Sequence, residues 1–154
     1  MFNQIIDANV NRIGEGLRVI EEYTRFVRSN ESLTNQLSAI RKRVTQAFPQ
    51  QSAYLHSRNT SRDTRAKEVP KKRGCAYDLL VANFKRVQEA FRVLEEYAAN
   101  EECNQCRYDM YDLEQQVLLL AKKPDIKRGV YLISHSVDII KQGIDWGCAL
   151  VQLR

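Results

Sequence analysis

Apolar residues recur at helical spacing over most of the chain, and this pattern predicts a mainly α-helical fold. Four long helices are expected, over 3–29, 33–48, 77–100 and 103–121. Polar residues that cap helices separate the first two. Pro49 and Pro124 end the second and the fourth, because proline lacks an amide hydrogen and clashes with the preceding turn. Before Pro124 no segment alternates with the two-residue period of a strand.

The pattern changes after Pro124. "GVYLIS" is a short run rich in β-forming residues, "VDIIKQGIDWG" has helical spacing, and "CALVQLR" is a second strand-like run. Strand, helix and strand in this order open a parallel α/β unit. One such unit cannot bury both faces of its strands, so we expect the truncated start of a second domain.

Two segments of fifteen residues have nearly the same sequence, "NVNRIGEGLRVIEEY" from Asn9 and "NFKRVQEAFRVLEEY" from Asn83, and both have helical spacing. At 100° per residue each copy places an asparagine, an arginine and a small residue within its apolar face. These residues are Asn9, Arg12 and Gly16, and Asn83, Arg86 and Ala90. We therefore expect the two helices to pack about an approximate twofold axis, with the small residues allowing close approach and the two arginines converging.

An arginine inside an apolar face must meet a negative charge, because burying it unpaired is costly. One hypothesis is a structural network in which Glu15 or Glu89 pairs with the arginine of the opposite helix. The other is a bound phosphate, which matches the planar guanidinium. Arg18 and Arg92 each stand four residues before a glutamate, which is also the spacing of a simple surface ion pair.

Charge narrows the choice of ligand. The formal net charge is +5, and the stretch 56–73 alone holds seven Lys and Arg against two acidic residues. This excess favours an anionic partner, either a phosphorylated small molecule or nucleic acid. The stretch has no interleaved aromatic residues and no base-reading helix, so nucleic acid is not expected. The loop 57–74 is long enough to be functional, and we expect it to be mobile when empty.

Other features exclude several classes of protein. There is no apolar run of about 18 residues and no basic segment followed by an apolar one at the start, so we expect neither a membrane span nor a secretory signal, and a cytoplasmic location. The phosphate-loop motif is absent, and Val19 replaces the last glycine of a dinucleotide fingerprint. "CNQC" has metal-like spacing without a second pair, which leaves ordinary thiols or a metal shared with a distant residue or a partner chain.

Four segments, in this order, resemble the helical domain often fused ahead of thiamine-phosphate synthase: "IIDANVNRIGEGLRVIEEYTRFV", "SRNTSRDT", "VANFKRVQEAFRVLEEYA" and "CRYDMYDLE". The tail, from "KRGVYLISHS" to "GCALVQLR", resembles the first strand, helix and second strand of the synthase (β/α)8 barrel. Gln152 and Arg154 resemble the start of its diphosphate-binding strand. The resemblance implies an all-helical kinase-like domain at 1–123 and a truncated barrel at 124–154, without the rest of the synthase active site.

The resemblance also implies a reaction in thiamine biosynthesis, in which ATP with Mg²⁺ phosphorylates hydroxymethylpyrimidine phosphate to the diphosphate. The catalytic residues would be Arg12, Arg86 and Asp63, and the metal would be held by Glu15 and Glu89. Contacts to phosphate or pyrimidine would come from Asn9, Asn83, Arg18, Arg58, Thr60, Arg92 and Arg107. The expected partners are this phosphorylated pyrimidine and a nucleotide, and a wide apolar face on the first helix is compatible with a homodimer.

The loop motif departs from the family pattern, which usually reads Arg-Asp-Thr-x-x-Asp-Val-Gly. Asn59 stands in place of the first aspartate, Thr64 in place of valine and Arg65 in place of glycine. A lost carboxylate would weaken magnesium binding. The alternative hypothesis is therefore a non-catalytic helical domain that serves thiamine-phosphate synthase in oligomerisation or as an accessory.

Overall fold

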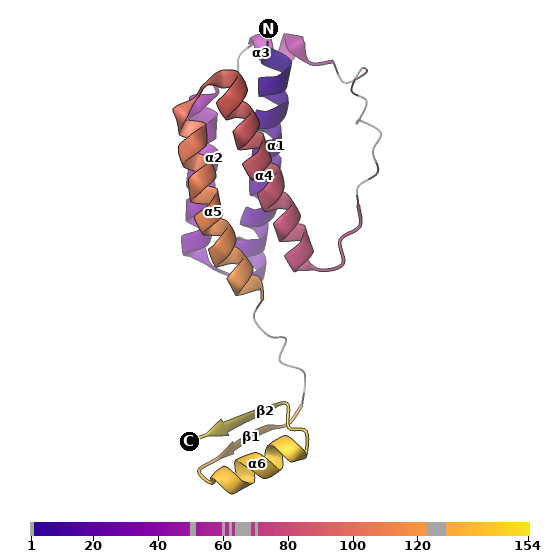
Figure 1. Ribbon diagram of the computed structural model, residues 1–154, viewed down its shortest axis with the longest axis vertical. Helices are drawn as coiled ribbons and strands as arrows, with labels where there is room; N and C mark the ends of the chain where they lie inside the picture. Colours follow the sequence, from indigo (N-terminus) through magenta and orange to yellow (C-terminus); the bar gives the residue numbers. More distant parts are fainter. Residues whose placement is uncertain are drawn as a thin grey trace. The chain divides into compact units, whose positions relative to one another are not determined.

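The structure is a computed structural model that describes residues 2–49, 52–59, 61, 63, 69, 71–122 and 129–154. Six α-helices, one π-helical segment and two strands lie in these ranges, so the predicted mainly α fold is confirmed. The chain forms two compact units, Met1–Lys122 and Lys123–Arg154 (Figure 1).

The first predicted helix is present, but its last turn widens. Helix α1 (Asn3–Glu22) continues into a π-helix, η1 (Tyr23–Val27). The Thr24 hydroxyl donates to the Glu21 carbonyl at 2.9 Å, and this hydroxyl lies 3.0 Å from that of Thr34 on the next helix. The widened turn therefore joins α1 to α2 (Glu31–Ala47), whose first turn is capped by Asn30 accepting from the Leu33 amide at 3.0 Å.

A short helix, α3 (Ser52–Ser57), follows and packs against α1. The sequence pattern does not predict it, because six residues are fewer than two helical turns and leave no apolar period to detect.

The third and fourth predicted helices are confirmed as α4 (Ala76–Ala98) and α5 (Glu101–Ala121). They are joined by Ala99, which adopts a left-handed conformation, and by Asn100, which caps α5 by accepting from the Glu102 amide at 2.9 Å. The two connecting residues reverse the chain within a single turn, so α5 packs along α4.

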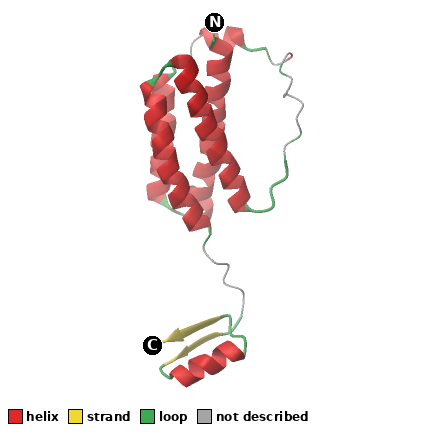
Figure 2. Cartoon of the chain, viewed as in Figure 1, coloured by secondary structure: helices red, strands yellow, loops and turns green. Residues whose placement is uncertain are grey.

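One apolar core joins the four long helices, whose arrangement is seen in Figure 2. Helix α1 runs antiparallel to α4 and packs most extensively against it (Figure 1), and α2 packs against α1 and α5. Side chains with no exposed surface fill the centre, among them Ile13, Leu17, Ile20, Leu37, Phe84, Val87, Phe91 and Met110. The core therefore fixes the α1–α4 contact on which the candidate site depends.

The second unit is a strand, a helix and a strand, as predicted: β1 (Tyr131–Ser134), α6 (Val137–Asp145) and β2 (Leu150–Leu153). The strands pair in parallel with Tyr131 opposite Leu150. Gly143 brings α6 onto the strands, since a β-carbon there would overlap the Leu132 side chain. Among the helices that the structure describes, none has the length and apolarity needed to cross a membrane.

Candidate functional site

A hollow of about 690 Å³ lies along the contact between α1 and α4. Helix α1 contributes Asn9, Arg12 and Glu15, and Asp63 reaches it from the loop after α3. Helix α4 contributes Ala82, Lys85, Arg86, Glu89, Ala90 and Val93. The structure thus places in one lining the three residues predicted to be catalytic, both predicted metal ligands and one of the two asparagines.

The two helices approach closely at their small residues. A β-carbon on Gly16 would lie 2.5 Å from Cγ2 of Val87, closer than atoms of neighbouring side chains can approach. Ala90, the matching residue of α4, is buried. The absence of a larger side chain at both positions is what lets the repeated segments lie against each other.

Each helix holds its arginine with its asparagine. The Asn9 side chain donates to the Ile5 carbonyl at 2.8 Å and accepts from Nη1 of Arg12 at 3.2 Å. Asn83 donates to the Leu79 carbonyl at 2.8 Å and accepts from Nη1 of Arg86 at 3.4 Å. The repeat in the sequence is therefore a repeat of hydrogen bonds, with the same donors and acceptors at the same spacing.

The arginines are exposed, whereas the helical wheel had placed them inside the apolar face. The part of each helix that is actually buried is narrower than the predicted apolar face. It includes the asparagine and the small residue but not the arginine. The cross-helix network with Glu15 or Glu89 is also not found: within the described ranges neither Arg12 nor Arg86 is in an ion pair. Both guanidinium groups keep donors that can meet an anion in the hollow.

The lining carries three basic and three acidic side chains. Lys85 is partly engaged elsewhere, since its Nζ lies 3.2 Å from Oε2 of Glu114 on α5. The described residues contain no group of three or more His, Cys, Asp or Glu that would hold a metal ion on its own. Mg²⁺ commonly binds through one or two carboxylates and the phosphates of its substrate, and Glu15, Glu89 or Asp63 fits that smaller role.

Arg58 is held away from the hollow lining, by an acidic residue that the sequence did not single out. Its Nε and Nη2 donate to the two carboxylate oxygens of Asp7, at 2.6 and 2.8 Å. The hydrogen bonds and charge of Arg58 lower the pKa of Asp7 although partial burial opposes them. This bidentate pair ties the segment after α3 to the first turns of α1.

The remaining predicted arginines belong to ion pairs outside the lining. Arg107 donates from Nε to Glu95 at 2.5 Å, where burial would raise the pKa of Glu95 but the pairing with Arg107 and Arg92 lowers it. The surface pairs that the spacing allowed are present, Arg18 with Glu22 at 3.1 Å and Arg92 with Glu96 at 2.5 Å. Their predicted roles, and that of Arg107, stay predictions.

Two further predictions concern the loop after α3. Thr60, predicted to contact phosphate, lies outside the described residues. The predicted mobility of the loop 57–74 also rests in large part on residues outside the described ranges, among them 64–68.

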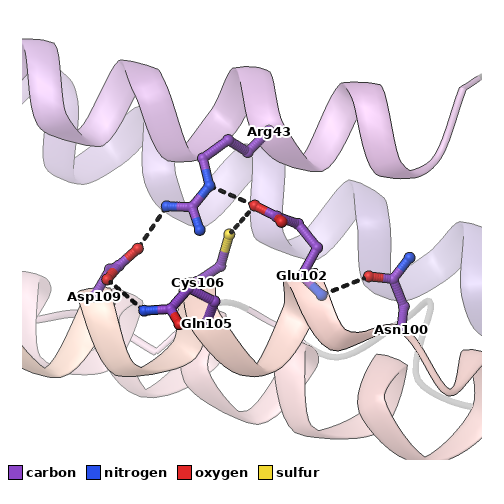
Figure 3. Close-up of polar contacts among 6 residues, drawn as sticks. All are labelled: Arg43, Asn100, Glu102, Gln105, Cys106 and Asp109. Carbon is purple, nitrogen blue, oxygen red and sulfur yellow. Dashed lines mark hydrogen bonds and ion pairs between the residues drawn. The ribbon is translucent and has the colours of Figure 1, made fainter.

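The CNQC segment lies on α5 and turns its two cysteines into the core, while Asn104 and Gln105 are exposed. Cys103 and Cys106 are free and buried, and burial raises the pKa of each thiol to about 12. Figure 3 shows Cys106 beside an ion-pair cluster in which Arg43 of α2 contacts Glu102 and Asp109 of α5, each at 2.5 Å. The cluster joins α2 to α5, and its hydrogen bonds, chiefly the one to Asp109, raise the pKa of Arg43.

Comparison with known proteins places the chain in a family. Its sequence matches the ThiD2 family over residues 4–116. It is 33% identical to thiamine-phosphate synthase of Thermosynechococcus vestitus over 170 residues, covering 99% of this chain and 48% of that protein. It is 36% identical to that of Synechocystis sp. over 165 residues, covering 98% and 48%.

A further relative, thiamine-phosphate synthase of Prochlorococcus marinus, is 35% identical over 127 residues, covering 77% of this chain and 36% of that protein. The chain thus spans about half or less of the length of these relatives. No solved structure matches it. The match covers the whole of the helical repeat and its hollow, and the chain belongs to the ThiD2 family.

Proposed function

We propose that the chain acts in thiamine biosynthesis and that its helical unit transfers a phosphoryl group from ATP to hydroxymethylpyrimidine phosphate. The observation that carries the proposal is the hollow between α1 and α4, whose lining holds both Arg12 and Arg86 beside acidic residues. Membership of the ThiD2 family and the likeness to thiamine-phosphate synthases support the pathway.

The reaction makes demands that this hollow can meet. An oxygen of the acceptor phosphate attacks the γ-phosphorus of ATP, the bond from that phosphorus to the bridging oxygen breaks, and ADP leaves with the electron pair. The acceptor is already an anion, so little proton transfer is required. The main obstacle is repulsion between two highly charged phosphates, which positioned cations reduce.

The basic and the acidic residues of the lining would have different roles in this reaction. Arg12 and Arg86 would bind and orient phosphate oxygens with the donors that the asparagines leave unused. Glu15, Glu89 or Asp63 would hold Mg²⁺, which supplies neutralising charge on the transferred group when bound. The partly exposed apolar side chains of Ala82 and Val93 would offer a surface for the pyrimidine ring.

A second candidate function is a non-catalytic domain that serves thiamine-phosphate synthase. Asn59 replaces an aspartate of the family loop motif, which removes a carboxylate. All four arginines predicted to contact phosphate are also in ion pairs: Arg58 with Asp7, Arg107 with Glu95, Arg18 with Glu22 and Arg92 with Glu96. These observations favour a structural domain over a complete active site.

Turnover separates the two candidates. The protein is mixed with Mg²⁺, ATP and hydroxymethylpyrimidine phosphate, and formation of ADP and of the pyrimidine diphosphate is followed by phosphorus NMR. The proposal predicts both products in equal amounts, and a loss of about 10²-fold or more in kcat/KM for Arg12→Ala or Arg86→Ala. The matched control is Arg25→Ala, an exposed arginine on η1 with the same loss of charge.

The control also guards against effects of net charge alone. Arg25 lies thirteen residues beyond Arg12, roughly 20 Å along the helix, so its substitution should leave turnover unchanged. A folded protein with no product would overturn the kinase proposal and leave the accessory domain. Equal losses in all three variants would overturn the assignment of the hollow as the site.

A further inference from the structure

The two asparagines of the repeat, of which Asn9 lines the hollow, are engaged within their own helices. Asn9 and Asn83 are only 4% and 5% exposed. Each uses its amide nitrogen on a main-chain carbonyl and its amide oxygen on the arginine that follows. Both amide groups therefore already have partners within the helix, whereas the resemblance implied that they contact the pyrimidine or a phosphate.

The hydrogen bonds give these asparagines another role. A long exposed arginine side chain loses conformational freedom when it binds a ligand, and a bond that fixes it beforehand lowers this cost. Each asparagine holds one nitrogen of the guanidinium, and a guanidinium has five donors. The remaining donors of the guanidinium stay available, and the bond to the asparagine restricts the orientations that the side chain samples.

The sequence repeat also makes the α1 side and the α4 side of the hollow alike. Helices α1 and α4 run antiparallel and both contribute an Asn–Arg pair with the same internal contacts. Both arginines lie in the lining of one hollow, whose volume of about 690 Å³ is that of a small-molecule site. An antiparallel pair of like sites suits a ligand with two like anionic groups.

We propose that the hollow contains two like anion subsites, Asn9–Arg12 and Asn83–Arg86, that together bind two linked phosphate groups. In this arrangement Asn9 and Asn83 are positioning residues that act through the arginines. The inference rests on the function proposed above and deepens it by assigning the ligand class, a diphosphate, to this hollow.

Calorimetric titration with inorganic diphosphate tests the pair of subsites, with inorganic phosphate as the comparison and no ATP present. One diphosphate should bind per chain, about tenfold or more tightly than phosphate, because the second subsite adds charge-assisted hydrogen bonds. Arg12→Ala and Arg86→Ala should weaken diphosphate binding by similar factors, and each should bring its affinity down toward that for phosphate. The Arg25→Ala variant should bind as the unmodified protein does.

A double-mutant cycle tests the positioning role. Asn83→Ala should weaken diphosphate binding in the presence of Arg86 and should have no further effect in the Arg86→Ala background. Asn83→Ala and Asn9→Ala act on different subsites, so the factors by which they weaken diphosphate binding should multiply in the double variant. Thermal melts of every variant establish that the compared proteins are folded.

Three results would overturn the inference. Diphosphate binding no tighter than phosphate, or dependence on only one of the two arginines, would remove the pair of subsites. An equal loss from Asn83→Ala in both backgrounds would make the asparagine a structural residue only. If diphosphate binds as stated but no kinase turnover is found, the proposed function fails and the two subsites stand.

Discussion

Gly16 of α1 lies directly against Val87 of α4, so that a β-carbon on Gly16 would be 2.5 Å from Cγ2 of Val87 and 3.5 Å from the Asn83 carbonyl oxygen. Val87 has no exposed surface and a branched side chain, which gives it little room to move aside. The contact lies within the repeated segments: Gly16 is about one helical turn after Arg12, and Val87 directly follows Arg86. The separation of the two arginines therefore depends on the glycine.

Gly16→Ala should destabilise the fold. Replacing a helical glycine gains about 0.5–1 kcal/mol in backbone entropy, but overpacking a well-filled contact costs about 1–3 kcal/mol. The balance is a net loss of about 1–2 kcal/mol in the free energy of unfolding. Urea denaturation followed by circular dichroism measures it.

Gly14 provides the matched control on the same helix. A β-carbon there would meet nothing within 4 Å, so Gly14→Ala should stabilise by about 0.5–1 kcal/mol. Adding Val87→Ala to Gly16→Ala should cost less than the two single changes together, since the methyl group then has space. Gly16→Ala as stabilising as Gly14→Ala would contradict the close contact.

The Asp7–Arg58 pair should make stability depend on acid. The pKa of Asp7 is lowered from its ordinary 3.8, first by hydrogen bonds from Arg58 and then by its charge. A carboxyl with a lower pKa in the folded state stabilises the fold above pH 3.8, and this contribution is lost as the pH falls through the folded value. Asp7→Asn should therefore lower the melting temperature near neutral pH, with the difference from the unmodified protein vanishing in strong acid.

Melting curves across the acid range check this dependence. Asp112→Asn, at an exposed carboxyl on α5, should leave the curve nearly unchanged. A difference between Asp7→Asn and the unmodified protein that persists undiminished at the lowest pH would show that the pair is not the cause.

Arg43 should stabilise the α2–α5 contact. It contacts both Glu102 and Asp109, and its loss would leave two carboxylates close together without a cation (Figure 3). Arg43→Gln should lower the free energy of unfolding by about 1–2 kcal/mol, less in high salt. The neighbouring exposed Lys42 offers the control, and equal effects of Lys42→Gln and Arg43→Gln in urea denaturation would refute a specific clamp.

Thiol labelling should distinguish the cysteines by burial. The pKa of Cys103 and Cys106 is raised to about 12 by burial, so they stay protonated and unreactive at pH values near 8. Exposed Cys75 should react at once with a thiol reagent. Mass spectrometry of labelled peptides checks the order, and fast labelling of Cys103 or Cys106 in the folded protein would contradict it.

These same thiols bear on alkaline stability. A thiol whose pKa is raised on folding stabilises the folded state fully below its ordinary value of 9.0, and this stability is lost as the pH rises toward about 12. Replacing both Cys103 and Cys106 by serine should remove the part of the fall in stability at alkaline pH that comes from ionisation of these thiols.

The sequence predicted the long helices and the pairing of α1 with α4, because both follow from local patterns. Apolar spacing sets a helix, and the near-identical segments at Asn9 and Asn83 indicated that two like faces meet. The pairs Arg18–Glu22 and Arg92–Glu96 also depend only on spacing along one helix, and the structure has them.

The contacts between helices could not be predicted in this way. Whether Arg58 meets Asp7, or Arg43 meets Glu102, depends on how each helix is rotated toward its neighbour, which no local spacing records. The exposure of Arg12 and Arg86 has the same origin, because a helical wheel shows a face but not the width of the arc that the neighbour covers.

The most direct test of the account observes the two guanidinium groups themselves. The Nε–H signals of Arg12 and Arg86 are assigned by NMR from the variants Arg12→Lys and Arg86→Lys, and hydroxymethylpyrimidine phosphate is then titrated into the unmodified protein. If the hollow between α1 and α4 binds the phosphorylated ligand, both signals should shift with one common midpoint while that of Arg25 stays in place. Signals of Arg12 and Arg86 that do not move at saturating ligand would contradict the account.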